Sequence, residues 1–507
     1  MLTHGAMGGM VHKVMKKKLN NSFMISFLAC FLSITVTTKQ AFAEYELKVS
    51  TYEKGLIQNS LGKTEDIRVV FLDLSDAKSI YLTEIALDGS VLSRVPILPN
   101  TLAVEEKVRE ALYYRESTDS YFLGWHGKGV YEFDRQGSQK SFIKTPPLTH
   151  DIHVDDNGIM TFAHSWSNER EPQAFQVDKT GKVLWQWNAT KFIKANKFKK
   201  SENRKEPENF AAATSAVPLG KNKVAVTLSA WNVVAIVDKK SNTVVKYISD
   251  TRRPHSVVVS NNQVIGYTSR SMSGLRKHGP GNSLVVYDNK HKMFSRTFAD
   301  GVKSLDLQYL GNELWLLPNG PNILIMDAEG IVYWQLDLEN YLYLDGARFS
   351  FTNAILIGND KEYKRPSETF KSPESDAVCK FTITAKKLDK RNKGREIARL
   401  ASGYISQKGP EIKFHIQTGW GFNKKRKDLL TNKQQLKIKG NELSGSLQVF
   451  SNYKDIEDSI KKPVKGTLKA KLKNGLLQNG DFPLKAKSGY STKTMNFKLS
   501  ECNTKSG

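Results

Sequence analysis

The sequence predicts an all-β protein in which a six-bladed β-propeller is followed by a small basic β-sandwich domain. A short strand, an aspartate turn and a second strand recur six times between residues 44 and 360. Around residue 376 this pattern has stopped, the charge becomes strongly positive, and a different alternation of apolar and charged residues begins. With 507 residues, the chain is long enough for two or three domains of ordinary size.

The repeat is an apolar strand that ends at an aspartate and is followed by a short turn. Its six aspartates are Asp88, Asp134, Asp178, Asp238, Asp288 and Asp327, at spacings of 46, 44, 60, 50 and 39 residues. Aspartate accepts hydrogen bonds from the turn, and the glycines beside several copies adopt positive φ. Repeats of about 40–50 residues made of short strands are typical of propeller blades. Six copies therefore predict six blades over residues 44–360.

A second repeated pattern, a strand, a turn and another strand, precedes these hairpins. Aligned on the strand that follows, His150, Ser215, His255 and Leu305 occupy equivalent positions, so we expect them at the starts of innermost strands around one mouth of a central channel. The long interval before Asp238 contains a charged insertion at 190–209, which we interpret as a surface loop or short helix.

The C-terminal segment is separated by a polar linker at 361–375 and covers 376–507. It holds 29 Lys and Arg against 11 Asp and Glu, a net charge of +18 out of +25 for the chain. Strands such as 436–439 alternate apolar residues with lysines, as expected for half-buried antiparallel strands with lysine-lined outer faces. This charge favours anionic glycans, lipopolysaccharide or anionic lipid as partners.

Residues 1–43 have the organisation of a secretory signal. A basic run at 16–18 precedes an apolar stretch at 23–36, and Ala41-Phe42-Ala43 provides a cleavage site after Ala43. We therefore expect a periplasmic or secreted protein and no nucleic-acid partner. Cys379 and Cys502 then remain near the two ends of the C-terminal domain, and an oxidising compartment favours a disulfide between them.

The sharpest candidate site is the pair His150 and His255, with Arg253 and Arg270 close to His255 in sequence. Imidazole can act as nucleophile or acid/base, and arginine can bind a sulfate or carboxylate in a bidentate manner. His153 lies on the opposite strand face from His150, so we expect it to pack between blades. No cofactor-binding motif is present, and two distant cysteines lack the spacing of metal ligands.

Residues 120–340 resemble the bacterial arylsulfate sulfotransferases. The resemblance is carried by Leu148-Thr-His150-Asp-Ile-His153, by the hairpin at 177–187, by the strand pair ending at Asp238, by Arg253-Pro-His255 with Ser269-Arg270, and by 330–334. It implies a periplasmic six-bladed propeller that transfers a sulfuryl group from a phenolic sulfate to a phenol, with His255 as the sulfated nucleophile and His150 as a channel histidine. The family's further histidine is missing from 210–215, and its arginine is missing near 229–231.

Three functions follow from these residues. The first is an enzyme that transfers a sulfuryl group, or acts on another anionic substrate, through His255, His150, Arg253 and Arg270. The second is a polysaccharide lyase acting on an anionic polysaccharide with the same residues. The third is a non-catalytic surface or matrix protein that binds anionic glycans.

Overall fold

The computed structural model is built almost entirely of β-strands. It describes residues 48–49, 67–73, 79–88, 90–99, 110–198, 210–249, 251, 253–269, 283–287, 293–298, 306–319, 322–337, 353–358, 375–386, 397–419, 435–449, 464–488 and 491–504. The expected signal segment at 1–43 lies outside these residues, and so does the expected linker except for Ser375. Among the described helices, none is both long enough and apolar enough to cross a membrane.

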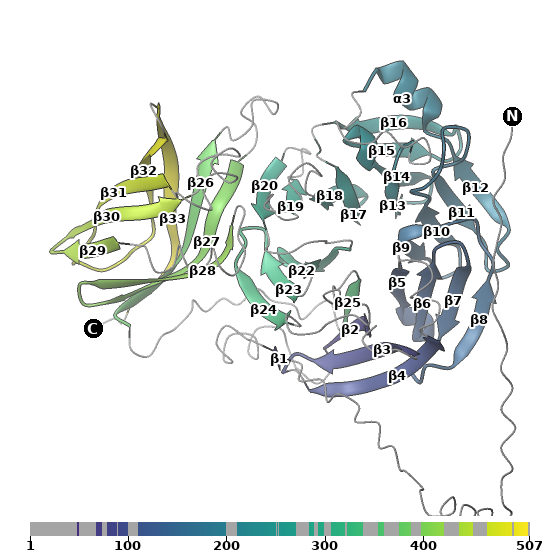
Figure 1. The fold of residues 1–507 in the computed structure, drawn as a ribbon, viewed down its shortest axis with the longest axis horizontal. Helices are drawn as coiled ribbons and strands as arrows, with labels where there is room; N and C mark the ends of the chain where they lie inside the picture. Colours follow the sequence, from purple (N-terminus) through teal and green to yellow (C-terminus); the bar gives the residue numbers. More distant parts are fainter. Residues whose placement is uncertain are drawn as a thin grey trace, which may run out of the picture. The chain divides into compact units, whose positions relative to one another are not determined.

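Six antiparallel sheets form the ring of a propeller, as the repeat predicts (Figure 1). Blade 2 contains β5 (Glu110–Arg115), β6 (Ser120–Trp125), β7 (Gly129–Phe133) and β8 (Gln139–Ile143). Blade 3 contains β9 (Thr149–Val154), β10 (Met160–Ala163), β11 (Ala174–Val177) and β12 (Val183–Trp187). Blade 4 contains β13 (Ala213–Leu219), β14 (Lys223–Leu228), β15 (Val233–Asp238) and β16 (Thr243–Ile248).

The remaining two complete repeats form blades 5 and 6. Blade 5 contains β17 (Pro254–Ser260), β18 (Gln263–Ser269), β19 (Ser283–Tyr287) and β20 (Met293–Phe298). Blade 6 contains β21 (Gln308–Gly311), β22 (Leu314–Asn319), β23 (Asn322–Asp327) and β24 (Val332–Asp337), and β1 (Lys48–Val49) pairs with the outer side of β24.

Blade 1 closes the ring with strands from both ends of the propeller sequence. Its innermost strand is β25 (Ala354–Ile357), which pairs with β2 (Arg68–Asp73), followed by β3 (Ser79–Ala86) and β4 (Val91–Pro99). Pairing of β25 with β2 ties the last propeller strand to the first blade. The ring therefore cannot open without breaking this backbone ladder.

The aspartate turns join the third and fourth strands of the blades, as the repeat predicts. In blade 2, Asp134 Oδ1 accepts hydrogen bonds from the backbone N–H groups of Gln136 and Ser138 at 3.0 and 2.8 Å. Asp178 makes the same contacts with Thr180 and Lys182 in blade 3. The turn of Asp288 lies outside the described residues.

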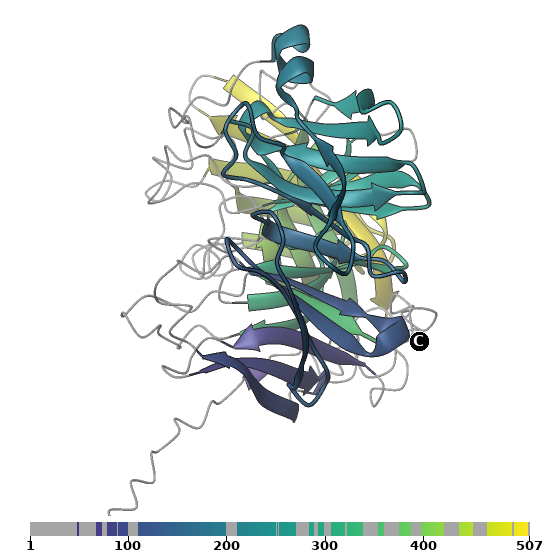
Figure 2. The same cartoon turned by 90° about the vertical axis from the view of Figure 1, so that its right-hand side faces the viewer.

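The apolar core of the propeller lies between neighbouring blades. Trp187 at the edge of blade 3 packs with alanines and valines of blade 4, and Trp315 of blade 6 packs with Leu284 and Val286 of blade 5. Part of the charged insertion forms α3 (Thr190–Asn196), whose buried Ile193 joins the core between blades 3 and 4. Figure 2 shows this helix projecting beyond the strands at one end of the blades. The short 3-10 helices η2 (Glu116–Thr118) and η4 (Ser229–Trp231) follow β5 and β14.

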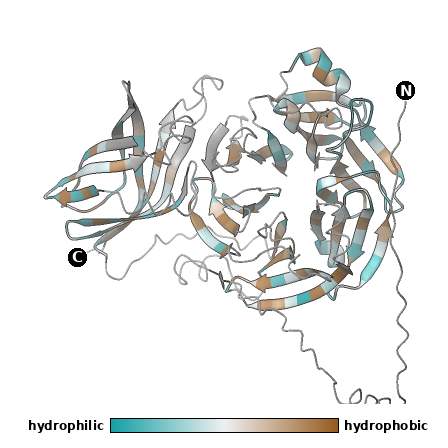
Figure 3. Ribbon diagram, in the orientation of Figure 1, coloured by the Kyte–Doolittle hydropathy of each residue, from teal (hydrophilic) through white to brown (hydrophobic). Residues whose placement is uncertain are grey.

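The C-terminal domain is an eight-stranded antiparallel sheet closed into a barrel, which refines the predicted sandwich. Its strands are β26 (Ala377–Lys386), β27 (Ile397–Lys408), β28 (Glu411–Gly419), β29 (Gln435–Lys439), β30 (Glu442–Val449), β31 (Val464–Lys471), β32 (Gly480–Ser488) and β33 (Ser491–Thr504). Each strand pairs with the next in sequence, and β33 pairs with β26. Hydrophilic and hydrophobic residues alternate along β29 and the other coloured parts of the barrel in Figure 3, but alternation alone does not reveal that the first and last strands pair.

The predicted disulfide is present and joins these two closing strands. Cys379 of β26 and Cys502 of β33 are bonded to each other across a sequence separation of 123 residues. Cys379 is fully buried among the apolar side chains that fill the barrel. The bridge therefore reinforces the seam at which the barrel closes.

Candidate functional site

The innermost strands of blades 3, 4 and 5 share a bulge near their start. Pairing to the second strand resumes at Ile152, Ala216 and Val257, after a shift in register in each blade. Counting back two residues from each places His150, Thr214 and His255 at the same position. The sequence predicts Ser215 at this position. That prediction is wrong by one residue, because the bulge cannot be recognised from strand alternation. Leu305 lies outside the described residues.

The two histidines predicted to share a channel mouth are in contact. Their ring centroids are 4.8 Å apart with the rings tilted by 50°, although they come from blades 3 and 5. Thr214 of the intervening blade 4 donates a hydrogen bond from Oγ1 to the backbone carbonyl oxygen of His255 at 2.6 Å. Both histidine side chains are buried, with 6% of His150 and 1% of His255 exposed. The contact therefore depends on three blades at once.

The backbone around this pair is strained. Arg253 has φ of 41°, a region that residues other than glycine, asparagine, aspartate and histidine rarely adopt, and His150 has φ of 65° in the same left-handed region. The N–H of Arg253 donates to Asn232 Oδ1 at 2.8 Å, which anchors the segment before β17. Arg253 is buried and stands two residues before His255, whereas Arg270 lies outside the described residues. Strain of this kind is common at functional sites.

A central cavity of about 1300 Å³ occupies the other part of the channel. It is lined by the six innermost strands and the residues that adjoin them, among them residues 151–156 of blade 3, 257–260 of blade 5 and 306–311 of blade 6. The histidine pair lies at the amino ends of two of these strands. Asp151, which directly follows His150, already lines the cavity, so the cavity begins next to the histidine pair.

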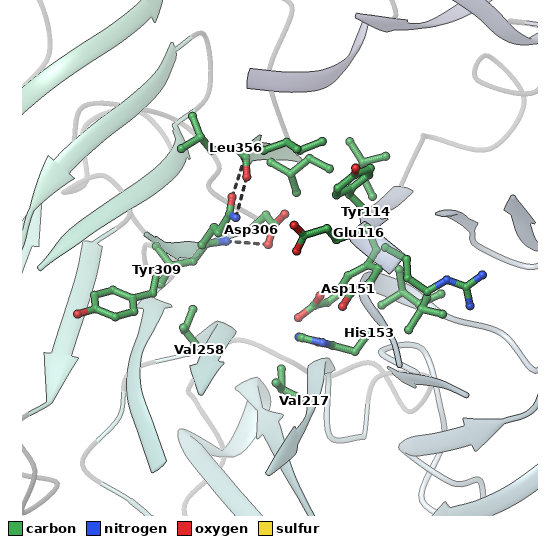
Figure 4. Close-up of a pocket in the computed structure, with 18 of the residues that line it drawn as sticks. Tyr114, Glu116, Asp151, His153, Val217, Val258, Asp306, Tyr309 and Leu356 are labelled. Atoms are coloured by element: carbon green, nitrogen blue, oxygen red, sulfur yellow. Dashed lines mark hydrogen bonds between the residues drawn. The ribbon is translucent and has the colours of Figure 1, made fainter. Parts of the chain in front are cut away.

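Asp151, His153 and Asp306 project into this cavity, together with Glu116 (Figure 4). Asp151 Oδ2 accepts a hydrogen bond from Ser215 Oγ at 2.6 Å, and the His153 ring lies 5.3 Å from the Tyr113 ring. His153 thus lines the channel, which corrects the expectation that it packs between blades. Beyond the bulge, Asp151 and His153 share the channel face of β9, while Ile152 and Val154 point into the blade core.

The environment perturbs the protonation of all three groups. Burial raises the pKa of the Asp306 carboxyl well above its ordinary value, and the negative charge of Asp151 raises it further. Burial also raises the pKa of Asp151, against the opposing effects of His153 and of the Ser215 hydrogen bond. Burial lowers the pKa of His153, which the Asp151 carboxylate partly offsets. Such displaced pKa values in one cavity are typical of acid/base sites.

The cavity has an excess of carboxyl groups. Its acidic residues are Glu116, Asp151, Asp155, Asp156 and Asp306. Its two arginines each contact a glutamate within the blades: Arg68 lies 3.3 Å from Glu84, and Arg115 lies 3.4 Å from Glu132. Within the described ranges, no cluster of three or more His, Cys, Asp or Glu residues is arranged to hold a metal ion. The cavity thus offers proton-transfer groups and a negative electrostatic potential.

Asp151 and Asp306 are not among the site residues predicted from the sequence, although the sequence carries a signal for them. Each directly follows a residue that was aligned as an inner-strand start, His150 and Leu305. His150 was predicted as a site residue because histidine is a common catalytic residue. The next residue faces the channel.

Comparisons with known proteins add the fold alone. No family model matches the chain, and no curated protein does. A protein of unknown function from Bacteroides caccae is 14% identical over 57% of this chain and 98% of its own, with a TM-score of 0.39. The WD40 propeller domain of Doa1 is 12% identical over 62% and 97%, with a TM-score of 0.37. A catalytically inactive virginiamycin B lyase from Staphylococcus aureus with quinupristin is 12% identical over 58% and 90%, with a TM-score of 0.33.

Proposed function

We propose that the protein is a transferase that moves a sulfuryl group from an aryl sulfate to a phenol at the histidine pair. The observation that carries this proposal is the contact between His150 and His255, made by side chains from two non-adjacent blades. The strained backbone at Arg253, two residues before His255, supports it, because a fold tolerates such strain where the geometry serves a function.

In the proposed reaction, a ring nitrogen of neutral His255 attacks the sulfur. The new N–S bond forms while the S–O bond to the aryl group breaks, and the His150 imidazolium protonates the leaving phenolate. In the second half, neutral His150 takes the proton of the acceptor phenol. The phenol oxygen then forms an S–O bond as the N–S bond breaks, which restores His255. The guanidinium of Arg253 supplies positive charge for the sulfate oxygens.

An aryl sulfate with a chromogenic phenolate tests this function directly. The mature protein should release phenolate only when a phenol acceptor is present, and His255→Ala should abolish the release. His415→Ala, at an exposed residue on β28 of the barrel, is the matched control and should retain full activity. Detection of a sulfated peptide containing residue 255 after a single turnover would add direct support. If the protein gives no acceptor-dependent release, this function is excluded.

A second candidate is acid/base chemistry in the cavity, as in a polysaccharide lyase. The observation that favours it is that His153 with a lowered pKa and Asp306 with a raised pKa line the same cavity. A neutral imidazole can remove the proton next to a uronate carboxylate, and a protonated carboxyl can donate a hydrogen bond to that carboxylate. Elimination then breaks the bond to the glycosidic oxygen, which takes the proton from the His153 imidazolium, and leaves an unsaturated chain end.

The two candidate functions predict different effects of His153→Ala and His255→Ala. Incubation with uronate polysaccharides should produce unsaturated ends that absorb in the ultraviolet if the lyase function holds. His153→Ala would then abolish activity, and His255→Ala would leave the chemistry of the cavity in place. If neither aryl sulfates nor uronate polysaccharides react, the remaining proposal is a non-catalytic glycan-binding protein.

A further inference from the structure

The outer face of the barrel carries lysines on β29 and β31, the two strands on either side of β30. Along β29, buried Leu436 and Ile438 alternate with exposed Lys437 and Lys439. The same alternation on β31 buries Leu468 and Ala470 and exposes Lys469 and Lys471. Because side chains alternate between the two faces of a strand, all four lysines point outward from the barrel.

Strand register aligns these lysines into two rows. Lys437 lies opposite Ser444, and Ser444 lies opposite Lys469. In the next row, Lys439 lies opposite Glu442, which lies opposite Lys471. Two strand spacings separate the lysines of one row by about 10 Å, and two residues along a strand separate the rows by about 7 Å. The first row has a hydroxyl between its two ammonium groups.

These lysines contrast with the one lysine that the described part of the barrel buries. Lys380 lies 3.6 Å from Asp327 and 2.7 Å from Glu501. Across the part of the chain that the structure describes, no carboxylate lies within 4.0 Å of Lys437, Lys469 or Lys471. Their charge is therefore directed to solvent.

The rest of this surface favours a water-soluble polyanion over a bilayer. The exposed large apolar side chains among the described residues are Val91, Leu92, Phe142, Val183, Leu184, Val245 and Tyr247. All of them lie on the fourth strands of blades 1 to 4, and none is on the barrel. A protein that lies on a membrane normally adds apolar anchors to its basic residues. The described barrel face offers charge and hydroxyl groups without such anchors.

We infer that the lysine rows of β29 and β31 bind an anionic polysaccharide. By contrast, the two arginines that line the propeller cavity each contact a glutamate, so the outward-facing lysines of the barrel provide the stronger attraction for a polyanion. In this arrangement the barrel attaches the protein to an anionic polymer while the propeller remains free for its own substrate.

The test compares retention of the full chain on immobilised dextran sulfate in a salt gradient. One variant replaces Lys437, Lys439, Lys469 and Lys471 by glutamine. The control variant replaces the exposed propeller residues Lys144, Lys179, Lys182 and Lys221 by glutamine, which changes the net charge by the same amount. We expect the barrel variant to bind about tenfold more weakly and to elute at lower salt, while the control elutes with the wild type.

Two outcomes would overturn the inference. Equal losses in both variants would mean that retention reports net charge alone. A loss by the barrel variant on anionic lipid vesicles, without any loss on dextran sulfate, would identify a membrane as the partner. Melting temperatures of all three proteins establish that the substitutions leave the barrel folded. Because sulfuryl transfer is measured on a small aryl sulfate, the barrel variant should keep that activity, and the two proposals can fail separately.

Discussion

The Lys380 ammonium of the barrel lies 3.6 Å from the Asp327 carboxylate of the propeller, and both side chains are almost completely buried. Asp327 is the sixth repeat aspartate, and its Oδ1 atom also accepts the turn N–H groups of Glu329 and Ile331. Lys380 further donates to Tyr333 Oη at 2.7 Å. The turn of the sixth repeat is therefore part of the contact between the propeller and the barrel.

Lys380→Met should destabilise the protein strongly. It would leave the Asp327 carboxylate buried without its cation, and breaking a buried pair in this way typically costs about 3–5 kcal/mol. Urea denaturation of Lys380→Met against wild type measures the loss. The exposed Lys473→Met is the control, with an expected change below about 0.5 kcal/mol.

Asp327→Asn should cost more than Asp178→Asn. Both aspartates accept the same pair of turn N–H groups, but Asp178 is on an exposed turn without a buried lysine. The difference between the two variants isolates the interdomain ion pair from the turn. Equal free energies of unfolding would show that the pair contributes nothing.

Removal of the disulfide should destabilise the barrel. Loss of a bridge that closes more than 100 residues removes a constraint on the unfolded chain estimated at about 4–5 kcal/mol. Calorimetry of the Cys379→Ser, Cys502→Ser double variant should show a lower melting temperature, matched by the wild type under reducing conditions. A transition that is insensitive to reductant would contradict the structure.

Asp306→Asn should stabilise the protein at neutral pH. The folded carboxyl has a raised pKa while the unfolded one titrates near 3.8, so the wild type loses stability as pH rises above that value. The Asp306→Asn variant does not lose this stability. Its advantage over the wild type should disappear below about pH 4, where the Asp306 carboxyl is protonated in both the folded and the unfolded state. Melting curves from pH 3 to 8 measure the effect. Asp156→Asn, in an exposed residue at the cavity rim, is the control.

Thr214→Val should impair the histidine site while leaving both imidazoles in the protein. The variant loses the hydrogen bonds from Thr214 Oγ1 to the His255 carbonyl oxygen and with Thr227 Oγ1. Leaving such buried groups unsatisfied costs about 1–3 kcal/mol. We expect lower kcat in the aryl sulfate assay with a smaller change in KM, because Thr214 positions His255. Thr180→Val, on an exposed turn, should leave both constants unchanged.

Periodicity and composition were enough to predict the propeller, its six blades, the basic C-terminal domain and the disulfide. These features are local or repeated: an aspartate turn recurs because each hairpin needs it, and charge composition changes where one domain ends. The contact of His150 with His255 was also predictable in outline, since equivalent positions in a closed ring must approach each other at its axis.

Which residues face the channel, and how the sheets close, depended on tertiary contacts. A bulge shifts the register so that Thr214 aligns with the histidines and Asp151 and His153 face the cavity. The pairings of β25 with β2 and of β33 with β26 join segments far apart in sequence, as does the burial of Lys380 against Asp327. Strand alternation records which residues share a face, but not which distant strand will cover that face, because that depends on the packing of the whole chain.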